Sequence, residues 1–139
     1  MRIWNYKSAK IGEFLPDLEL EPISRANLAL YAGASGDHNP LHIDTDYANK
    51  IGLPDVIAHG MIIMGYLGKV LTNNFHQSQI LEYNVQFCSI TNIGDKLTCR
   101  AKVVKTFTNG TKKNLKLELS VKDQNDDLKL KGYSLIKIL

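Results

Sequence analysis

The hydrophobic periodicity of this 139-residue chain changes at Ile80, and that change constrains the fold more than any other feature. After Ile80, apolar and polar residues alternate one by one over 83–87, 97–103, 115–121 and the start of 128–138. A period of two is typical of strands with one dry and one wet face. Turn residues separate these runs, among them the Asn-Gly pair at 109–110, which is a strong hairpin signal. The second half of the chain therefore predicts an antiparallel sheet whose dry face needs a cover.

The segment 60–71, just before the sheet, supplies that cover. It is almost wholly apolar, which predicts a helix buried on most sides. Gly65 and Gly68 lower its helix propensity, so we expect them to allow close approach by a neighbouring element. The pattern predicts an α+β fold, with one domain over residues 1–139 and a sheet curled around one helix.

Two shorter helices are expected in the first half of the chain. The first is predicted over 25–32, with Ser24 as its N-cap and with Gly33 and Gly36 ending it. The second is predicted to begin at Thr45 or Asp46, with Asp44 or Thr45 as its cap, and to end near Gly52. Asp44 and Asp46 are thus interpreted as cap and first-turn acids. Pro40 stiffens the connection between the two helices.

That connection carries a distinctive set of polar residues, and a second short motif precedes the apolar helix. The first motif is Ser35-Gly36-Asp37-His38-Asn39-Pro40-Leu41-His42, and the second is Ala58-His59-Gly60-Met61. Their order resembles the MaoC-like family of (R)-specific enoyl-thioester hydratases and (3R)-hydroxyacyl-thioester dehydratases. The segment 82–87 is also similar to a strand of the dehydratase branch. The resemblance implies the hot-dog fold, paired edge to edge into a dimer.

The chemistry of such an enzyme suits the residues in these motifs. Histidine transfers protons near neutral pH, and a carboxylate beside it can hold a water molecule, so Asp37 and His42 are the candidate acid–base pair. Asn39 can hydrogen-bond the water or Asp37, as the resemblance implies. Gly60 would offer a backbone N–H at a helix start to the thioester oxygen. Ser35, His59 and Met61 are expected to contact the substrate. No metal or organic cofactor is expected.

Each of these residues also has a purely structural interpretation. Asp37 alone could be a turn former, and His42 alone could be a half-buried histidine with one backbone bond. Ser35 could bond to Asp37 or be an exposed loop serine. His59 could be a structural residue at the start of the helix. It is the complete set of motif residues that favours catalysis.

The sequence therefore predicts a lyase that hydrates 2-enoyl thioesters or dehydrates 3-hydroxyacyl thioesters, carried by coenzyme A or acyl carrier protein. The dehydratase of fatty-acid synthesis is slightly favoured over the hydratase of oxidation. A non-catalytic, acyl-binding subunit of a heterodimer is the alternative, although such a chain has no need of Asp37, Asn39 and His42 together. Thioester hydrolysis fits the order of the motif poorly.

Composition excludes several other classes of function. The net charge of +3 is mild and no basic stripe with aromatics appears, so no nucleic-acid partner is expected. Lys129, Lys131 and Lys137 are expected on a solvated sheet face, or else on a surface for an anionic partner. Cys88 and Cys99 are expected to be buried free thiols. With no apolar leader and no membrane-length apolar run, we expect a cytoplasmic protein, present as a homodimer or larger even oligomer.

Overall fold

The computed structural model describes residues 4–139, so residues 1–3, on which the expectation of no signal peptide partly rests, lie outside it. Helices fill the first half of the chain and long strands fill the second. The helical elements are the 3-10 turns Tyr6–Ser8 (η1), Pro40–His42 (η2) and Gln77–Gln79 (η3), and the α-helices Arg25–Ser35 (α1), Thr45–Lys50 (α2) and Gly60–Thr72 (α3). The strands are Leu18–Glu19 (β1), Ile80–Phe87 (β2), Thr98–Asn109 (β3), Lys112–Lys122 (β4) and Leu128–Ile138 (β5).

The five strands form one sheet in the order β1-β3-β4-β5-β2, and every neighbouring pair is antiparallel. The hairpin between β3 and β4 turns at Gly110, whose φ of 62° suits glycine. The strand β2 precedes β3 in the chain but pairs with β5, so it forms one edge of the sheet. The two-residue β1 forms the other edge. With its helices and this single antiparallel sheet, the chain has the predicted α+β fold.

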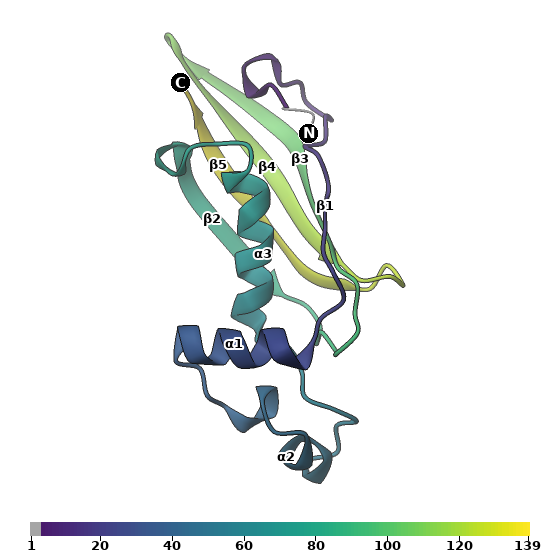
Figure 1. The fold of residues 1–139 in the computed structure, drawn as a ribbon. Helices are drawn as coiled ribbons and strands as arrows, with labels where there is room; N and C mark the ends of the chain where they lie inside the picture. The colour runs from purple at the N-terminus through teal and green to yellow at the C-terminus, as the bar shows by residue number, and fades with distance from the viewer. Residues whose placement is uncertain (1–3) are drawn as a thin grey trace.

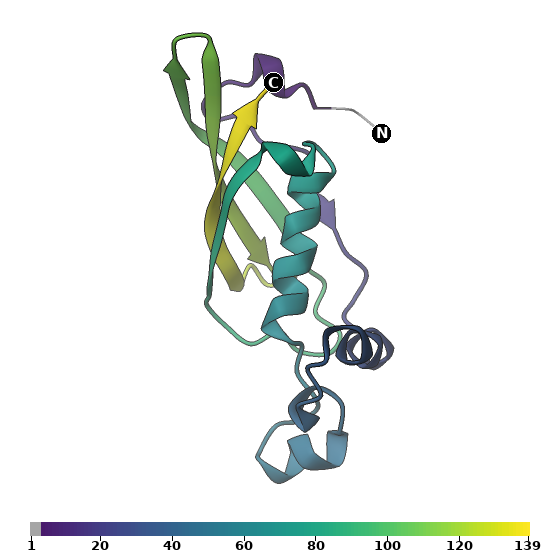
Figure 2. The same cartoon turned by 90° about the vertical axis from the view of Figure 1, so that its left-hand side faces the viewer.

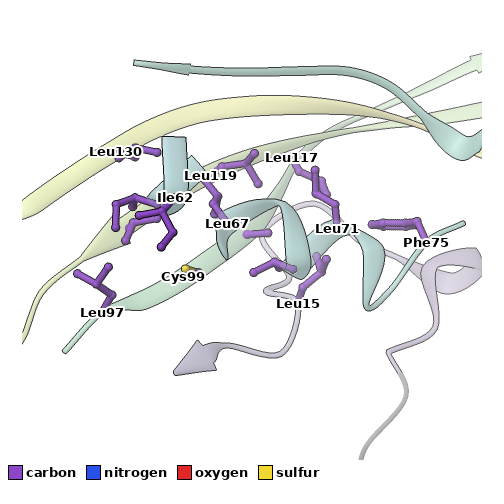
Figure 3. Close-up of a cluster of buried hydrophobic side chains, with 14 of the residues drawn as sticks. Leu15, Ile62, Leu67, Leu71, Phe75, Leu97, Cys99, Leu117, Leu119 and Leu130 are labelled. Atoms are coloured by element: carbon purple, nitrogen blue, oxygen red, sulfur yellow. The ribbon is translucent and has the colours of Figure 1, made fainter. Parts of the chain in front are cut away.

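The core lies between the sheet and α3, which runs along one face of it (Figures 1 and 2). Leucines of α3 and of the central strands meet there (Figure 3), and the fully buried members of this cluster include Leu67, Leu71, Leu97, Leu117 and Leu119. Their strand neighbours Lys116, Glu118 and Lys122 point the other way, as the alternation predicts. Both α1 and α2 gather at the N-terminal end of α3 (Figures 1 and 2). The candidate site residues come from this end.

Three details of the helices differ from the prediction. The helix α1 continues through Gly33 and ends at Gly36, whose φ of 78° permits the left-handed cap. The helix α3 is buried on one side only, because a single sheet covers it, and Met61 and Gly65 are exposed. Close approach occurs at Gly68, where an added Cβ would lie 3.4 Å from the ring of Tyr83, and not at Gly65.

Two expectations about side chains were also wrong. Lys129 is buried, with only 3% of its side chain exposed, whereas Lys131 and Lys137 are exposed as predicted. Cys99 is buried in the core, and burial raises the pKa of its thiol to about 12. Cys88 is exposed because it follows the last residue of β2, where the strand leaves the sheet. Over residues 4–139, no helix has the length and apolar content needed to cross a membrane.

Candidate active site

The loop from α1 to η2 holds itself in shape through a chain of short hydrogen bonds. The N–H of Asp37 donates to Ser35 Oγ at 3.1 Å, and the N–H of Asn39 donates to Asp37 Oδ1 at 3.3 Å. The N–H of Leu41 in turn donates to Asn39 Oδ1 at 3.0 Å. Such bonds to a backbone group two residues ahead are typical of serine, aspartate and asparagine in turns. Ser35 and Asn39 therefore shape the loop that presents Asp37.

The tautomer of His42 is set by a backbone contact. Its Nδ1 lies 2.7 Å from the carbonyl oxygen of Ile57. Because a carbonyl can only accept, Nδ1 carries the proton and donates it. In the neutral ring, the other nitrogen, Nε2, then carries the lone pair. His42 is thus prepared to accept a proton at Nε2.

His59 supports this pair from the start of α3. Its ring is buried and stacks on His42, with 3.9 Å between ring centroids, while Tyr31 contacts it edge-on at 4.8 Å. Its Nε2 donates to the backbone carbonyl of Asp37 at 3.2 Å, and its Nδ1 has no hydrogen-bond partner among the described residues. Burial lowers the pKa of His59, and the nearby His42 lowers it further. A neutral His59 connects His42 to the loop of Asp37 without adding charge.

These three residues do not form a good metal site. One potential ligand atom from each of Asp37, His42 and His59 lies within 4.8 Å of the other two. However, the two imidazole rings are stacked at an interplanar angle of 25°, so their in-plane lone pairs do not converge on one ion. Their proximity instead favours an acid–base group around Asp37 and His42.

A cavity of about 350 Å³ opens beside His42. Apolar side chains dominate its walls, which is typical of small-molecule sites. Its lining residues are His42, Ile57, Ala58, Gly60, Ile63, Phe87, Cys88, Ser89, Ile90, Thr91 and Leu130. A larger hollow of about 610 Å³ lies on the other face of the sheet and contains neither His42 nor Gly60. The smaller cavity is therefore the candidate site.

Gly60 is the first residue of α3, so its end of the helix carries the positive end of the dipole and N–H groups without helical partners. Phe87, the last residue of β2, covers it: an added Cβ on Gly60 would lie 2.9 Å from Phe87 Cε1. The cavity thus lies between His42 and a helix N-terminus that could receive a developing negative charge.

The structure brings together most of the residues that the sequence singled out. Asp37, His42 and His59 converge, and Gly60 shares the cavity with His42. Of the predicted site residues, His42 and Gly60 line the cavity. The others, Ser35, Asp37, Asn39, His59 and Met61, are not part of its lining, and Met61 is 55% exposed. Sequence reasoning missed Ile57, which orients His42, and Phe87, which covers Gly60. For Phe87 the sequence held one indication, its position at the end of an alternating strand. It held no indication for Ile57, because the contact with His42 is made by a backbone carbonyl, which every residue has.

Comparison with known proteins finds one matching family and several similar proteins and structures. The family described as MaoC like domain matches residues 10–125. The mitochondrial 3-hydroxyacyl-[acyl-carrier-protein] dehydratase of Arabidopsis thaliana is 28% identical over 88 residues, which is 63% of this chain and 52% of that protein. The (R)-specific enoyl-CoA hydratase of Rhodospirillum rubrum is 34% identical over 83 residues, 58% of each chain.

A solved structure, the (R)-hydratase from A. caviae involved in PHA biosynthesis, is 25% identical with a TM-score of 0.77. The match covers 96% of this chain and 99% of that one. The chain therefore shares the fold of that hydratase over nearly all of its described length, although it spans only about half the length of the two curated relatives above.

Proposed function

The chain belongs to the family of MaoC like domains, and from this premise we propose that it is a hydro-lyase acting on acyl thioesters. The reaction is the reversible addition of water to a trans-2-enoyl thioester, which gives a (3R)-hydroxyacyl thioester. One observation carries the proposal. The Nδ1 proton of His42 is donated to the Ile57 carbonyl, which leaves Nε2 as the basic atom of a ring that lines an apolar cavity and lies close to Asp37.

The proposed steps use the groups of this chain alone. Asp37 and His42 hold a water molecule between them and share its proton as the oxygen bonds to C3. The electrons of the C2–C3 double bond move toward the thioester carbonyl, and the oxygen gains negative charge. The helix start at Gly60 stabilises that charge, and a proton returns to C2. Dehydration follows the same path in reverse.

Asn39, Ser35 and His59 hold Asp37 and His42 in place in this scheme. The hydrogen bonds of Ser35 and Asn39 are local to the loop, and His59 bonds to the backbone of Asp37. Met61, exposed next to Gly60, would contact only a part of the substrate outside the cavity. No cofactor enters the scheme.

We place the activity in fatty-acid metabolism and prefer the dehydratase of synthesis, which the resemblance of 82–87 supports. The carrier is coenzyme A or acyl carrier protein. We also propose a homodimer, supported by the open edge of β2, and a cytoplasmic location, supported by the free thiols of Cys88 and Cys99.

The decisive experiment incubates the purified protein with crotonyl-, octenoyl- and longer enoyl-CoA, and with the same acyl groups on acyl carrier protein, and follows loss of the conjugated thioester. We expect hydration of at least one substrate. Asp37 and His42 lie on one short loop and approach the substrate from one side, so addition is expected to be syn.

A coupled assay tests the stereochemistry. The hydrated product of crotonyl-CoA is offered to an (S)-specific 3-hydroxyacyl-CoA dehydrogenase, and a (3R) product yields no NADH. A strong NADH signal would contradict the (R) assignment. Absence of hydration with every substrate would contradict the enzyme assignment and leave the acyl-binding subunit.

A further inference from the structure

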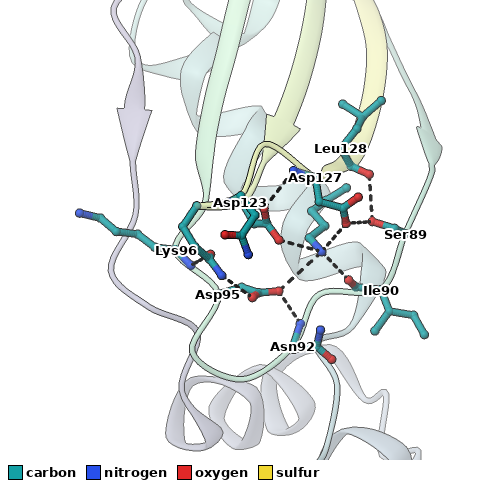
Figure 4. A network of polar contacts seen from close by, with 11 residues as sticks. Ser89, Ile90, Asn92, Asp95, Lys96, Asp123, Asp127 and Leu128 are labelled. Carbon is teal, nitrogen blue, oxygen red and sulfur yellow. Dashed lines mark hydrogen bonds and ion pairs between the residues drawn. The ribbon is translucent and has the colours of Figure 1, made fainter.

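Lys129 lies near the start of β5, at a position that faces away from the core, and makes an unusual set of contacts for such a position. Its side chain is 3% exposed, and its ammonium lies 2.8 Å from both the carbonyl oxygen of Ile90 and Asp127 Oδ2. Asp123 Oδ2 lies 3.3 Å away and Asp95 Oδ2 lies 3.6 Å away. One buried cation therefore faces three carboxylates and a backbone carbonyl (Figure 4).

The three carboxylates also organise the loops that carry them. Asp95, in the connection from β2 to β3, accepts the N–H of Asn92 at 2.8 Å. Asp123, in the turn from β4 to β5, accepts the N–H groups of Asn125 at 2.8 Å and of Asp127 at 3.0 Å. Lys129 thus joins two loops that are far apart in the sequence, each already folded around its own aspartate.

The charge balance makes the ammonium necessary for this arrangement. Burial disfavours the charge of Lys129, but the three carboxylates outweigh this effect, so its pKa is raised. The contact with Lys129 lowers the pKa of Asp127. Three ionised carboxylates without the ammonium would repel one another. A buried ion pair adds little to the free energy of unfolding compared with an apolar residue of the same size. We therefore interpret the Lys129 cluster as a group that holds the two loops in one geometry.

The loop that Lys129 holds is also a wall of the cavity. Ser89, Ile90 and Thr91 line it. Ser89 Oγ donates to Asp127 Oδ2 at 2.8 Å, and the carbonyl of Ile90 is bound by Lys129 itself. The carbonyl of Thr91 accepts the N–H of Ala58 at 2.9 Å. The position of this wall is therefore tied to the ammonium on one side and to the residues before α3 on the other.

The same contacts continue to the acid–base pair. Asn92 pairs with Ile57 in an isolated antiparallel bridge. The carbonyl of Ile57 receives the Nδ1 proton of His42. A shift of the loop 89–92 would therefore move the group that sets the tautomer of His42.

We propose that Lys129 is a positioning residue for the active site: by holding the loop 89–92 it keeps the Ile57 carbonyl in place, and so keeps the proton of His42 on Nδ1. The role in turnover rests on the proposed hydratase function. The role in setting the His42 tautomer does not.

The test compares Lys129→Met, which removes the charge but keeps the length, with Lys131→Met as a matched control on an exposed lysine of the same strand. We expect kcat of Lys129→Met to fall about 10–100-fold with a smaller change in KM, since misplacement by about 1 Å can cost about 10²-fold. Nitrogen-15 NMR of the imidazoles should show His42 changing from one tautomer to a mixture. Amide exchange over 89–92 should become faster, and Lys131→Met should match wild type in all three measurements.

A folded Lys129→Met variant with kcat within twofold of wild type and an unchanged His42 tautomer would overturn the inference. If that variant does not fold, the double variant Lys129→Met/Asp127→Asn replaces it, because it removes one of the repelling carboxylate charges but still lacks the ammonium. The same results for kcat and for the His42 tautomer would support or overturn the inference. A wild-type protein that hydrates no thioester refutes the proposed function, whereas the tautomer and exchange measurements still decide the role of Lys129.

Discussion

At the scale of single residues, the proposed chemistry depends on which nitrogen of His42 carries the proton. A carbonyl 2.7 Å from Nδ1 answers that question, because it leaves Nε2 as the basic atom. The side chain of Asp37 is held less firmly: among the described residues it accepts only the N–H of Asn39, and it is exposed to solvent. The pair therefore combines one oriented base with one open carboxylate.

Asp37→Asn and His42→Ala should each abolish hydration while the protein keeps its fold, because neither side chain belongs to the core. General acid–base groups contribute about 10²–10⁴-fold, so losses in that range are expected in kcat. His38→Ala is the matched control, a histidine exposed on the same loop, and should keep wild-type activity. Steady-state kinetics with circular dichroism checks this. A folded Asp37→Asn or His42→Ala variant whose kcat stays within threefold of the wild-type value would contradict the catalytic assignment.

At the scale of secondary-structure elements, the cavity depends on where α3 begins and where β2 ends. The helix presents its N-terminus through Gly60, and the strand places the ring of Phe87 directly over that glycine. Phe87 is half exposed, so its ring has room to turn aside. The two elements together shape the region in which the thioester carbonyl would lie.

Gly60→Ala should lower kcat at least tenfold and change KM less, because the methyl crowds a carbonyl whose charge develops only in the transition state. The same methyl would also push against Phe87, and kinetics in a Phe87→Leu background separates the two effects. The loss of kcat should persist there. Recovery of kcat in that background, or a rise in KM alone, would assign the glycine a packing role.

At the scale of the whole molecule, the sheet is unequal at its two edges. The edge strand β1 has two residues, whereas β2 offers eight with exposed Leu81 and Phe87. A long, apolar edge invites pairing with another strand. The exposed side of α3, with Met61, faces away from the sheet and adds apolar surface. These features support the proposed homodimer.

Light scattering at micromolar concentration should therefore give a mass of about 31 kDa, twice the 15.6 kDa of the chain. Leu81→Lys places a charge on the β2 edge and should shift the protein toward monomer. Ile11→Lys, at an exposed apolar residue outside the named strands, should leave the mass unchanged. A stable wild-type monomer that is still active would refute the dimer.

Local patterns in the sequence were enough to predict the elements themselves. The alternation after Ile80 predicted four strands, and the caps Ser24 and Asp44 predicted where two helices begin; both side chains accept first-turn N–H groups as expected. The loop from Ser35 to His42 was also predictable, because its hydrogen bonds join residues two positions apart. Each of these features depends on neighbours in the chain, and the sequence records such neighbours directly.

Only the tertiary structure decided which distant segments meet. Nothing in the alternation showed that β2 pairs with β5, that His59 stacks on His42, or that Lys129 lies buried among three aspartates. Lys129 was expected in solvent because its strand position points outward, but two loops fold over that position and bring their charges to it. The physical reason is that periodicity encodes which face of an element is apolar, whereas pairing, burial of a charge and the orientation of an imidazole depend on contacts among several segments at once.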